Sequence, residues 1–300
     1  MDNILKFFPY EIAEKIKENI IENIEEIRVR VNQPIILKNS KKEIQILYYI
    51  TSDDIIKILQ KICDNSVYSY QNQICNGYIT LKGGHRVGIA GKAVIKNGQV
   101  INISHISSLN FRIARQIFNC SNSVLKYIIK LNENDIYNTL IVSPPGCGKT
   151  TILRDLVRRL SNGIPEINFK GITIGVVDER GEISAMSNEG IPQNNIGIRT
   201  DVIENIPKSL GIKILVRSMS PKIIVADEIG SKEDIDAIKY AICSGVRGIF
   251  TAHGANLEEI ENNPILNKLI NNQILDRILF LDKERKIRIG YDKYRNLEVC

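Results

Sequence analysis

Residues 143–151, SPPGCGKTT, have the types and spacing needed to bind a phosphate group through a tight turn. The apolar run at 139–142 predicts a buried strand before the turn, and a helical pattern opens at Lys149. Glycines in the turn let backbone N–H groups face an anion at the helix N-terminus. We expect Lys149 to reach the β- and γ-phosphates of ATP and the Thr150 hydroxyl to be a Mg²⁺ ligand. The predicted phosphate-binding residues are Pro145, Gly146, Cys147, Gly148, Lys149, Thr150 and Thr151.

One position departs from the usual pattern of such a loop. The pattern G-x-x-x-x-G-K-[ST] asks for glycine five residues before Gly148, where this chain has Ser143. Serine tolerates the start of a turn less freely than glycine, but the later glycines and the Lys-Thr-Thr run are intact. The alternative is a glycine-rich turn between a strand and a helix that binds no ligand.

A second candidate for chemistry is the apolar run 223–226, which ends in Asp227 and Glu228. At the carboxyl end of a strand beside the phosphate loop, Asp227 can hold Mg²⁺ through its water shell. Glu228 can orient and deprotonate an attacking water. An apolar strand that ends in two acids is common by itself, so the inference depends on its pairing with the phosphate loop.

Two further groups follow apolar runs in the same half of the chain. The run VDERGE at 177–182 brings acids to a strand end, and Glu179 is a catalytic candidate there; the alternative is a solvated loop with a local ion pair. The run GIFTAHGAN at 248–256 ends a strand with Thr251 and His253. At such an edge His253 can contact the γ-phosphate, although a lone histidine is more often structural.

Length and composition favour a globular protein of two domains. The chain has 300 residues, 43% of them hydrophobic, and its net charge is +6, with Lys and Arg scattered among Glu and Asp and not gathered in one tail. Six cysteines without a C-x-x-C pair suit a reducing cytoplasm. Charged residues interrupt the N-terminal apolar positions, so we expect neither a signal peptide nor a membrane span.

The hydrophobic pattern changes near residue 120. Residues 1–120 combine amphipathic helices with alternating strands, including an Asn97-Gly98 hairpin signal, and predict an α+β domain. Residues 121–300 alternate helices with continuous apolar runs, which predicts an α/β domain with a parallel, right-handed βαβ sheet of nucleotide-binding type.

The motifs together resemble a known family. SPPGCGKTT, VVDERGEI, LVRSMSPKIIVADEIG, EEIRVRVNQP and GGHRVGIAGKA are similar to the stage III sporulation protein AA family, within the superfamily of secretion and pilus-retraction ATPases. The run 251–256 resembles the histidine box of that superfamily, and 178–182 its acidic box. The superfamily usually carries glycine before the Walker-B glutamate, whereas this chain has Asp227, which strengthens the metal-ligand role of that residue.

The resemblance implies a RecA-like P-loop ATPase domain preceded by a smaller α+β domain. It also implies a homo-oligomer, a hexameric ring with ATP and Mg²⁺ at its interfaces, that energises a channel between mother cell and forespore. The implied partners are membrane-embedded proteins of the sporulation export complex. The implied location is the mother-cell cytoplasm, peripheral to the membrane through these partners.

Arginines decide whether a ring matters for the chemistry. Transition-state charge on a γ-phosphoryl group usually requires a guanidinium, and one supplied by a neighbouring subunit raises the rate by about 10³ to 10⁵. We take Arg217 as the catalytic candidate in the ATPase domain, with Arg180 and Arg199 as alternatives. Further candidates lie in or after the β-rich stretch, at Arg86, Arg112 and Arg115.

Two other functions remain open on the sequence alone. A nucleic-acid-dependent RecA-like motor shares the same core fold, but the chain has no tryptophan and no basic cluster with interleaved aromatics, so we expect no nucleic-acid partner. A ring that uses ATP only as structural glue would not need the water-activating carboxylate of Glu228.

Overall fold

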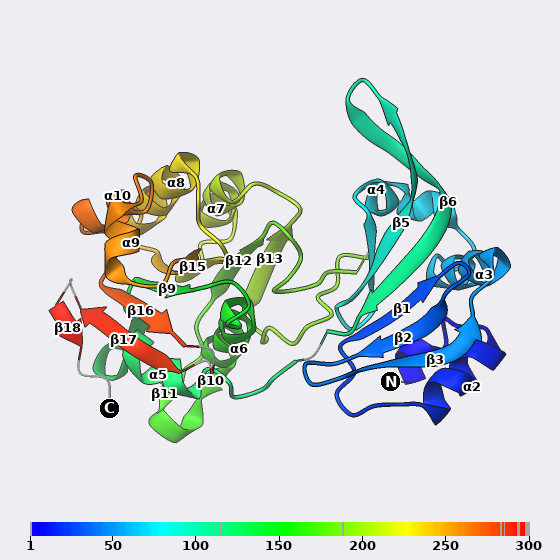
Figure 1. The fold of residues 1–300 in the computed structure, drawn as a ribbon. Helices are drawn as coiled ribbons and strands as arrows, with labels where there is room; N and C mark the ends of the chain where they lie inside the picture. The colour runs from blue at the N-terminus through cyan, green and yellow to red at the C-terminus, as the bar shows by residue number, and fades with distance from the viewer. Residues whose placement is uncertain are drawn as a thin grey trace. The chain divides into compact units, whose positions relative to one another are not determined.

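A computed structural model describes residues 2–114, 116–187, 189–282, 284, 286–292 and 295–297. By its contacts the chain forms two compact units (Figure 1). Unit 1 comprises residues 1–115 with the segment 187–193, and unit 2 comprises 116–186 with 194–300. The segment 187–193 therefore belongs to unit 1, although it follows the acidic run of unit 2 in sequence. Arg115 lies outside the described residues.

Unit 1 is built on one antiparallel sheet of six strands in the order β3-β2-β1-β6-β5-β4. The strands are β1 (Glu26–Arg30), β2 (Pro34–Lys38), β3 (Glu43–Tyr49), β4 (Tyr78–Leu81), β5 (His85–Lys96) and β6 (Gln99–Arg112). The helices are α1 (Asp2–Leu5), α2 (Tyr10–Glu18), α3 (Ser52–Ile62) and α4 (Gln71–Cys75), with a 3₁₀ turn at Val67–Tyr70.

Local sequence signals explain several boundaries in this unit. The Thr51 hydroxyl accepts from the Asp54 N–H and the Asp54 carboxylate accepts from the Thr51 N–H, which forms a capping box at the start of α3. Asn97 and Gly98 adopt positive φ and join β5 to β6 with Lys96 opposite Gln99, which confirms the predicted hairpin. Figure 1 shows this hairpin projecting beyond the rest of the unit 1 sheet.

Unit 2 contains one sheet of eight strands in the order β13-β12-β14-β15-β9-β16-β17-β18, with two two-stranded ribbons beside it. From β13 to β16 all neighbours run parallel, and β17 and β18 add antiparallel strands at one edge. The strands are β9 (Thr139–Ser143), β12 (Ile174–Asp178), β13 (Thr200–Glu204), β14 (Ile223–Ala226), β15 (Arg247–His253), β16 (Arg277–Leu281), β17 (Ile287–Asp292) and β18 (Arg295–Leu297). The ribbons are β7 (Ile129–Lys130) with β8 (Asp135–Ile136), and β10 (Gly163–Ile164) with β11 (Phe169–Lys170).

Helices cover both faces of this sheet (Figure 1). They are α5 (Asn122–Ile128), α6 (Lys149–Asn162), α7 (Lys208–Ser218), α8 (Lys232–Cys243), α9 (Leu257–Asn262) and α10 (Asn267–Asn271). In β14, Ile223 and Val225 enter one core cluster with α5 and α6, whereas Ile224 and Ala226 enter the other with α7 and α8. Burial on both faces accounts for the continuous apolar run of this strand.

The described architecture confirms the predicted fold class, an α/β domain with a parallel sheet preceded by a smaller α+β domain. The short strand β13 was not predicted, because its residues 200–204 carry three polar side chains and only two apolar ones. No helix among the described residues combines the length and apolar character that crossing a lipid bilayer requires.

A buried carboxylate fastens α6 to the start of α5. Asp155 is only 3% exposed, and its Oδ2 accepts from the N–H of Ser121 at 2.9 Å and from the hydroxyl at 2.7 Å. The Arg158 guanidinium donates to Oδ1 at 2.6 Å. Burial acts to raise the pKa of Asp155, but the bonds from Ser121 and Arg158 outweigh it, so the pKa is lowered from its ordinary value.

We predict that Asp155→Asn lowers the free energy of unfolding of unit 2 by about 2 to 3 kcal/mol at neutral pH, because charge-assisted bonds to a buried carboxylate are lost. The folded-state pKa is below the unfolded one, so this stabilisation is present above the unfolded pKa and is lost as pH falls through the folded pKa. Urea unfolding followed by circular dichroism should therefore show the parent and variant converging in acid. Asp53→Asn, which removes an exposed ion pair with Lys57, is the control and should leave the transition unchanged. A difference that persists undiminished at acid pH would contradict the assignment.

Candidate active site

The phosphate loop joins the end of β9 to the start of α6. Gly148, at the N-cap, has φ +82°, and Gly146 has φ +79°, with no atom within 4 Å of an added Cβ. Glycine is therefore needed at 146 for its backbone conformation and not for space. Ser143, at the position where the usual loop has glycine, is the last residue of β9 and is 1% exposed. Ser143 has an extended backbone, which any residue can adopt, so glycine is not needed at this position.

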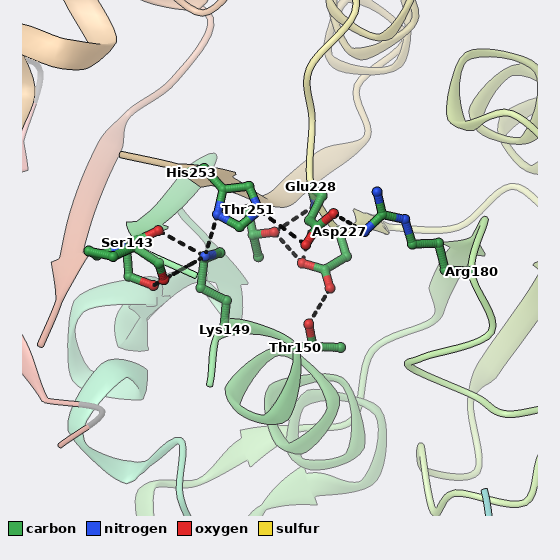
Figure 2. A network of polar contacts seen from close by, with 9 residues as sticks. Ser143, Lys149, Thr150, Arg180, Asp227, Glu228, Thr251 and His253 are labelled. Atoms are coloured by element: carbon green, nitrogen blue, oxygen red, sulfur yellow. Dashed lines mark hydrogen bonds and ion pairs between the residues drawn. The ribbon is translucent and has the colours of Figure 1, made fainter. Parts of the chain in front are cut away.

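The Lys149 ammonium is held by the loop itself. Its Nζ donates to the Ser143 carbonyl at 2.8 Å and to the Pro144 carbonyl at 3.2 Å (Figure 2). It also lies 3.1 Å from Nδ1 of His253. Burial lowers the pKa of Lys149, although the Asp227 and Glu228 carboxylates act in the opposite direction.

Two threonine hydroxyls flank the carboxylate of Asp227. Thr150, in the first turn of α6, donates to Oδ2, and Thr251, on β15, donates to Oδ1. Thr251 is completely buried. A hydroxyl and a carboxylate are oxygen donors of the kind that Mg²⁺ binds, usually together with waters and substrate phosphates. The described residues form no cluster of three or more His, Cys, Asp or Glu that could hold a metal ion.

Glu228 lies in a strained backbone conformation. Its φ is +52°, a region that non-glycine residues seldom adopt. The Glu228 N–H donates to the Thr251 hydroxyl at 2.8 Å, and it lies 3.2 Å from Oδ1 of Asp227. These contacts hold the backbone against a cost of about 1 to 3 kcal/mol. The Glu228 carboxylate lies between His253 and Arg180, as Figure 2 shows.

His253 connects the phosphate loop to Glu228. An ammonium can only donate, so Nδ1 of His253 accepts from Lys149. Nε2, 3.2 Å from Oε1 of Glu228, then carries the ring proton and donates to the carboxylate. The imidazole thus links Lys149 to Glu228.

The acidic loop after β12 divides its carboxylates between two tasks. Asp178 is 3% exposed and accepts from the N–H groups of residues 182, 183 and 184 and from the Ser184 hydroxyl. Its oxygens are therefore used to build the loop. Glu179 forms an ion pair with Lys208, at the start of α7. A small cavity beside both acidic segments is lined by Val177, Asp178, Glu179, Arg180, Glu182, Lys208, Asp227 and Glu228.

The structure brings most of the predicted site residues together. Lys149, Thr150, Asp227, Glu228 and His253 form one connected network at the carboxyl ends of β9, β14 and β15. Glu179 lines the same cavity as Glu228. Its catalytic role stays a prediction.

Arg217 lies elsewhere. It is in the last turn of α7, just before β14 begins, where its Nε is 3.3 Å from the Tyr240 hydroxyl. That position is at the amino ends of the parallel strands, the opposite edge of the sheet. A catalytic role for Arg217 would therefore require a neighbouring copy, and it stays a prediction. Arg199 donates to the Ser161 carbonyl at 3.0 Å and serves packing around α6.

Sequence reasoning did not assign roles to Thr251 or Lys208. Thr251 precedes His253 by two residues in one strand, so the period of two places both on the same face. That spacing could have indicated that Thr251 reaches Asp227. Nothing near Lys208 in the sequence indicates its pairing with Glu179, because the two residues belong to separate elements brought together by the fold.

Sequence comparisons identify relatives over nearly the whole chain. The family model described as sporulation stage III, protein AA, matches residues 2–294. Stage III sporulation protein AA of Bacillus subtilis (strain 168) is 40% identical over 277 residues, which are 91% of this chain and 88% of that protein. The uncharacterized protein ycf45 of Cyanidium caldarium is 29% identical and matches 74% of this chain and 58% of its own length.

Comparison with solved structures shows a shared fold. The ATPase DotB of Legionella pneumophila aligns over 96% of this chain and 81% of its own, with a TM-score of 0.58 and 14% identity. The pilus retraction motor PilT, solved with bound ADP, aligns over 90% of this chain and 77% of its own, with a TM-score of 0.58 and 15% identity. Together with the phosphate loop and the parallel sheet, these likenesses support a RecA-like ATPase fold for unit 2.

Proposed function

Because the chain belongs to the sporulation stage III protein AA family, we propose that it is a Mg²⁺-dependent ATPase that drives a membrane export apparatus during sporulation. The observation that carries the ATPase proposal is the continuous polar network from Lys149 through His253 to Glu228. It joins the group that would bind the phosphates to the group that would activate water. The ADP in the PilT structure supports an adenine nucleotide as the ligand of this fold.

Each residue of the site has a distinct task in the proposed reaction. The loop N–H groups and Lys149 bind the phosphates of ATP. Thr150 and Asp227 would hold Mg²⁺, which neutralises phosphate charge when bound. Glu228 orients the attacking water and accepts its proton, and His253 contacts the γ-phosphate. Thr251 keeps Asp227 and the Glu228 backbone in place.

The proposed function also includes an oligomeric assembly and a location in the cell. We propose a homo-oligomeric ring, a hexamer, on the cytoplasmic face of membrane-embedded sporulation proteins in the mother cell. There ATP turnover would energise the channel to the forespore. Family membership and the fold shared with DotB and PilT support this assignment. Unit 1 is the proposed contact with these partners, because the residues of the ATP site described above all belong to unit 2.

Two substitutions should separate binding from turnover. Lys149→Ala should weaken ATP binding by about 100-fold, because the phosphates lose their charge-assisted bonds to the buried ammonium. Glu228→Gln should bind ATP like the parent but reduce turnover by about 10² to 10⁴, because only proton acceptance is lost. Titration with a fluorescent ATP analogue and a phosphate-release assay measure the two properties.

The matched control is Lys286→Ala, which removes an exposed lysine paired with Glu284 and should change neither property. Repeating the assay with single-stranded nucleic acid tests the motor alternative, and we expect no stimulation. If Glu228→Gln turned over ATP at the parent rate, Glu228 would not be the base, and Glu179 or Glu182 would replace it.

If a ring completes the site, turnover per subunit should fall when the protein is diluted below the dissociation range of the oligomer. Light scattering at matched concentrations should show the loss of activity and the loss of mass together. Activity per subunit that stays flat over about a thousandfold dilution, while the mass falls to that of a monomer, would refute the need for assembly.

In a spore-forming host, replacing the gene with Lys149→Ala should arrest development after engulfment, because an export motor without nucleotide cannot supply the forespore. The readouts are spore counts and forespore reporter expression, with immunoblots to confirm normal protein levels. Lys286→Ala is again the control. Parental sporulation by the Lys149→Ala strain would defeat the export-motor assignment, and DNA-repair or RNA-processing defects would favour the nucleic-acid motor.

A further inference from the structure

The Glu228 carboxylate is shared between two partners. Its Oε1 accepts from His253, and its Oε2 forms an ion pair with the Arg180 guanidinium (Figure 2). The Arg180 side chain is 64% exposed and that of Glu228 is 25% exposed. The group assigned to accept a proton from water is therefore paired with a cation of the same chain.

The backbone that carries Arg180 is anchored on both sides. Asp178, two residues before it, is the last residue of β12 and accepts from the N–H groups of the residues that follow Gly181. The Gly181 N–H lies 3.3 Å from the Asp178 carbonyl, and Gly181 has φ +63°. Arg180 thus projects from a fixed loop at the carboxyl edge of the sheet. Since its side chain is largely in solvent, a change of rotamer displaces no core packing.

The charges in the site favour transfer of this guanidinium to a nucleotide. The contacts run without interruption from Lys149 through His253 and Glu228 to Arg180. A γ-phosphate bound by Lys149 therefore arrives beside the group that Arg180 already contacts. It brings more negative charge than a single carboxylate and several acceptor oxygens, to which the planar guanidinium can bind in bidentate fashion.

We propose that Arg180 is one arginine of this active site and that it acts within its own subunit, beside any arginine that a neighbouring copy supplies. Its guanidinium, paired with Glu228, would contact the γ-phosphoryl oxygens when ATP binds. The inference rests on the proposed ATPase function and extends it by naming the arginine. The other ATPase-domain candidates are engaged elsewhere, Arg217 beside Tyr240 and Arg199 at the Ser161 carbonyl.

The transfer couples substrate arrival to the release of the base. While Glu228 is paired with Arg180, the guanidinium occupies one oxygen of the carboxylate that would otherwise face the attacking water. Once Arg180 contacts the phosphate, Glu228 can accept a proton from water. The water oxygen bonds to the γ-phosphorus, the bond to the β–γ bridging oxygen breaks, and ADP leaves with that electron pair. Glu228 later releases its proton to solvent.

The first test measures Arg180→Ala and Arg180→Lys beside the parent. We expect Arg180→Ala to lower kcat by about 10³-fold or more, with little change in ATP affinity, and Arg180→Lys to be intermediate. Added guanidinium chloride, at concentrations too low to unfold the protein, should restore part of the activity of Arg180→Ala only. The control is Arg247→Ala, an ion-paired arginine at the start of β15, which should leave kcat unchanged.

The second test separates phosphate contact from mere positioning of Glu228. In a Glu228→Gln background, adding Arg180→Ala should weaken binding of MgADP with aluminium fluoride, a mimic of the transferring phosphoryl group, by at least about tenfold. Binding of MgADP alone should not change. Equal binding of the fluoride complex with and without Arg180 would overturn the proposal, as would a kcat for Arg180→Ala within about threefold of the parent. A parent protein that neither binds nor hydrolyses ATP would instead refute the proposed function itself.

Discussion

The parallel register of four strands is the constraint on which the candidate site depends. Val177 pairs with Ala226, and Ala226 pairs with Phe250, so the next residues, Asp178, Asp227 and Thr251, fall at one level of the sheet. His253 pairs with Ser143, which places the histidine beside the start of the phosphate loop. A shift of one strand by a single residue would turn the side chains of that strand to the other face and remove them from this cluster. Helix α6 matters because it brings Lys149 and Thr150 to that same edge.

Two aspartates at this edge of the sheet differ in the groups that donate hydrogen bonds to them. Asp178 and Asp227 both end buried strands, yet Asp178 is fully engaged by N–H groups of its own loop, whereas Asp227 is bonded mainly by the hydroxyls of Thr150 and Thr251. Hydroxyls can rotate and rebond, so the carboxylate of Asp227 stays available to a cation. Backbone amides cannot do so without unfolding the loop. The distinction between a structural and a functional aspartate is therefore made by the donors around each one.

Much of the fold and of the site could be predicted from local patterns. The strand, turn and helix around Lys149 are contiguous in sequence, as are the capping box at Thr51 and the hairpin at Asn97. The acids at 227 and 228 were found because an apolar run ends there. The sequence did not predict the ion pairs between distant segments, which join Lys208 to Glu179 and Arg180 to Glu228. It also did not predict that Arg217 lies beside Tyr240 at the opposite edge of the sheet. The left-handed backbone of Glu228 was equally hidden, because glutamate gives no local signal for positive φ.

A nucleotide that binds this loop would have to replace the present contacts of Lys149. The ammonium already has three oxygen partners in Ser143 and Pro144 and a nitrogen partner in His253. Phosphate oxygens would therefore exchange with ligands that the protein provides for itself. The observed binding free energy would then be the difference between two sets of bonds, and the observed dissociation constant would exceed the intrinsic one by the factor that corresponds to breaking the first set. In the proposed function, the oxygens of Ser143 and Pro144 would therefore compete with the nucleotide for Lys149 at an effective concentration fixed by the fold.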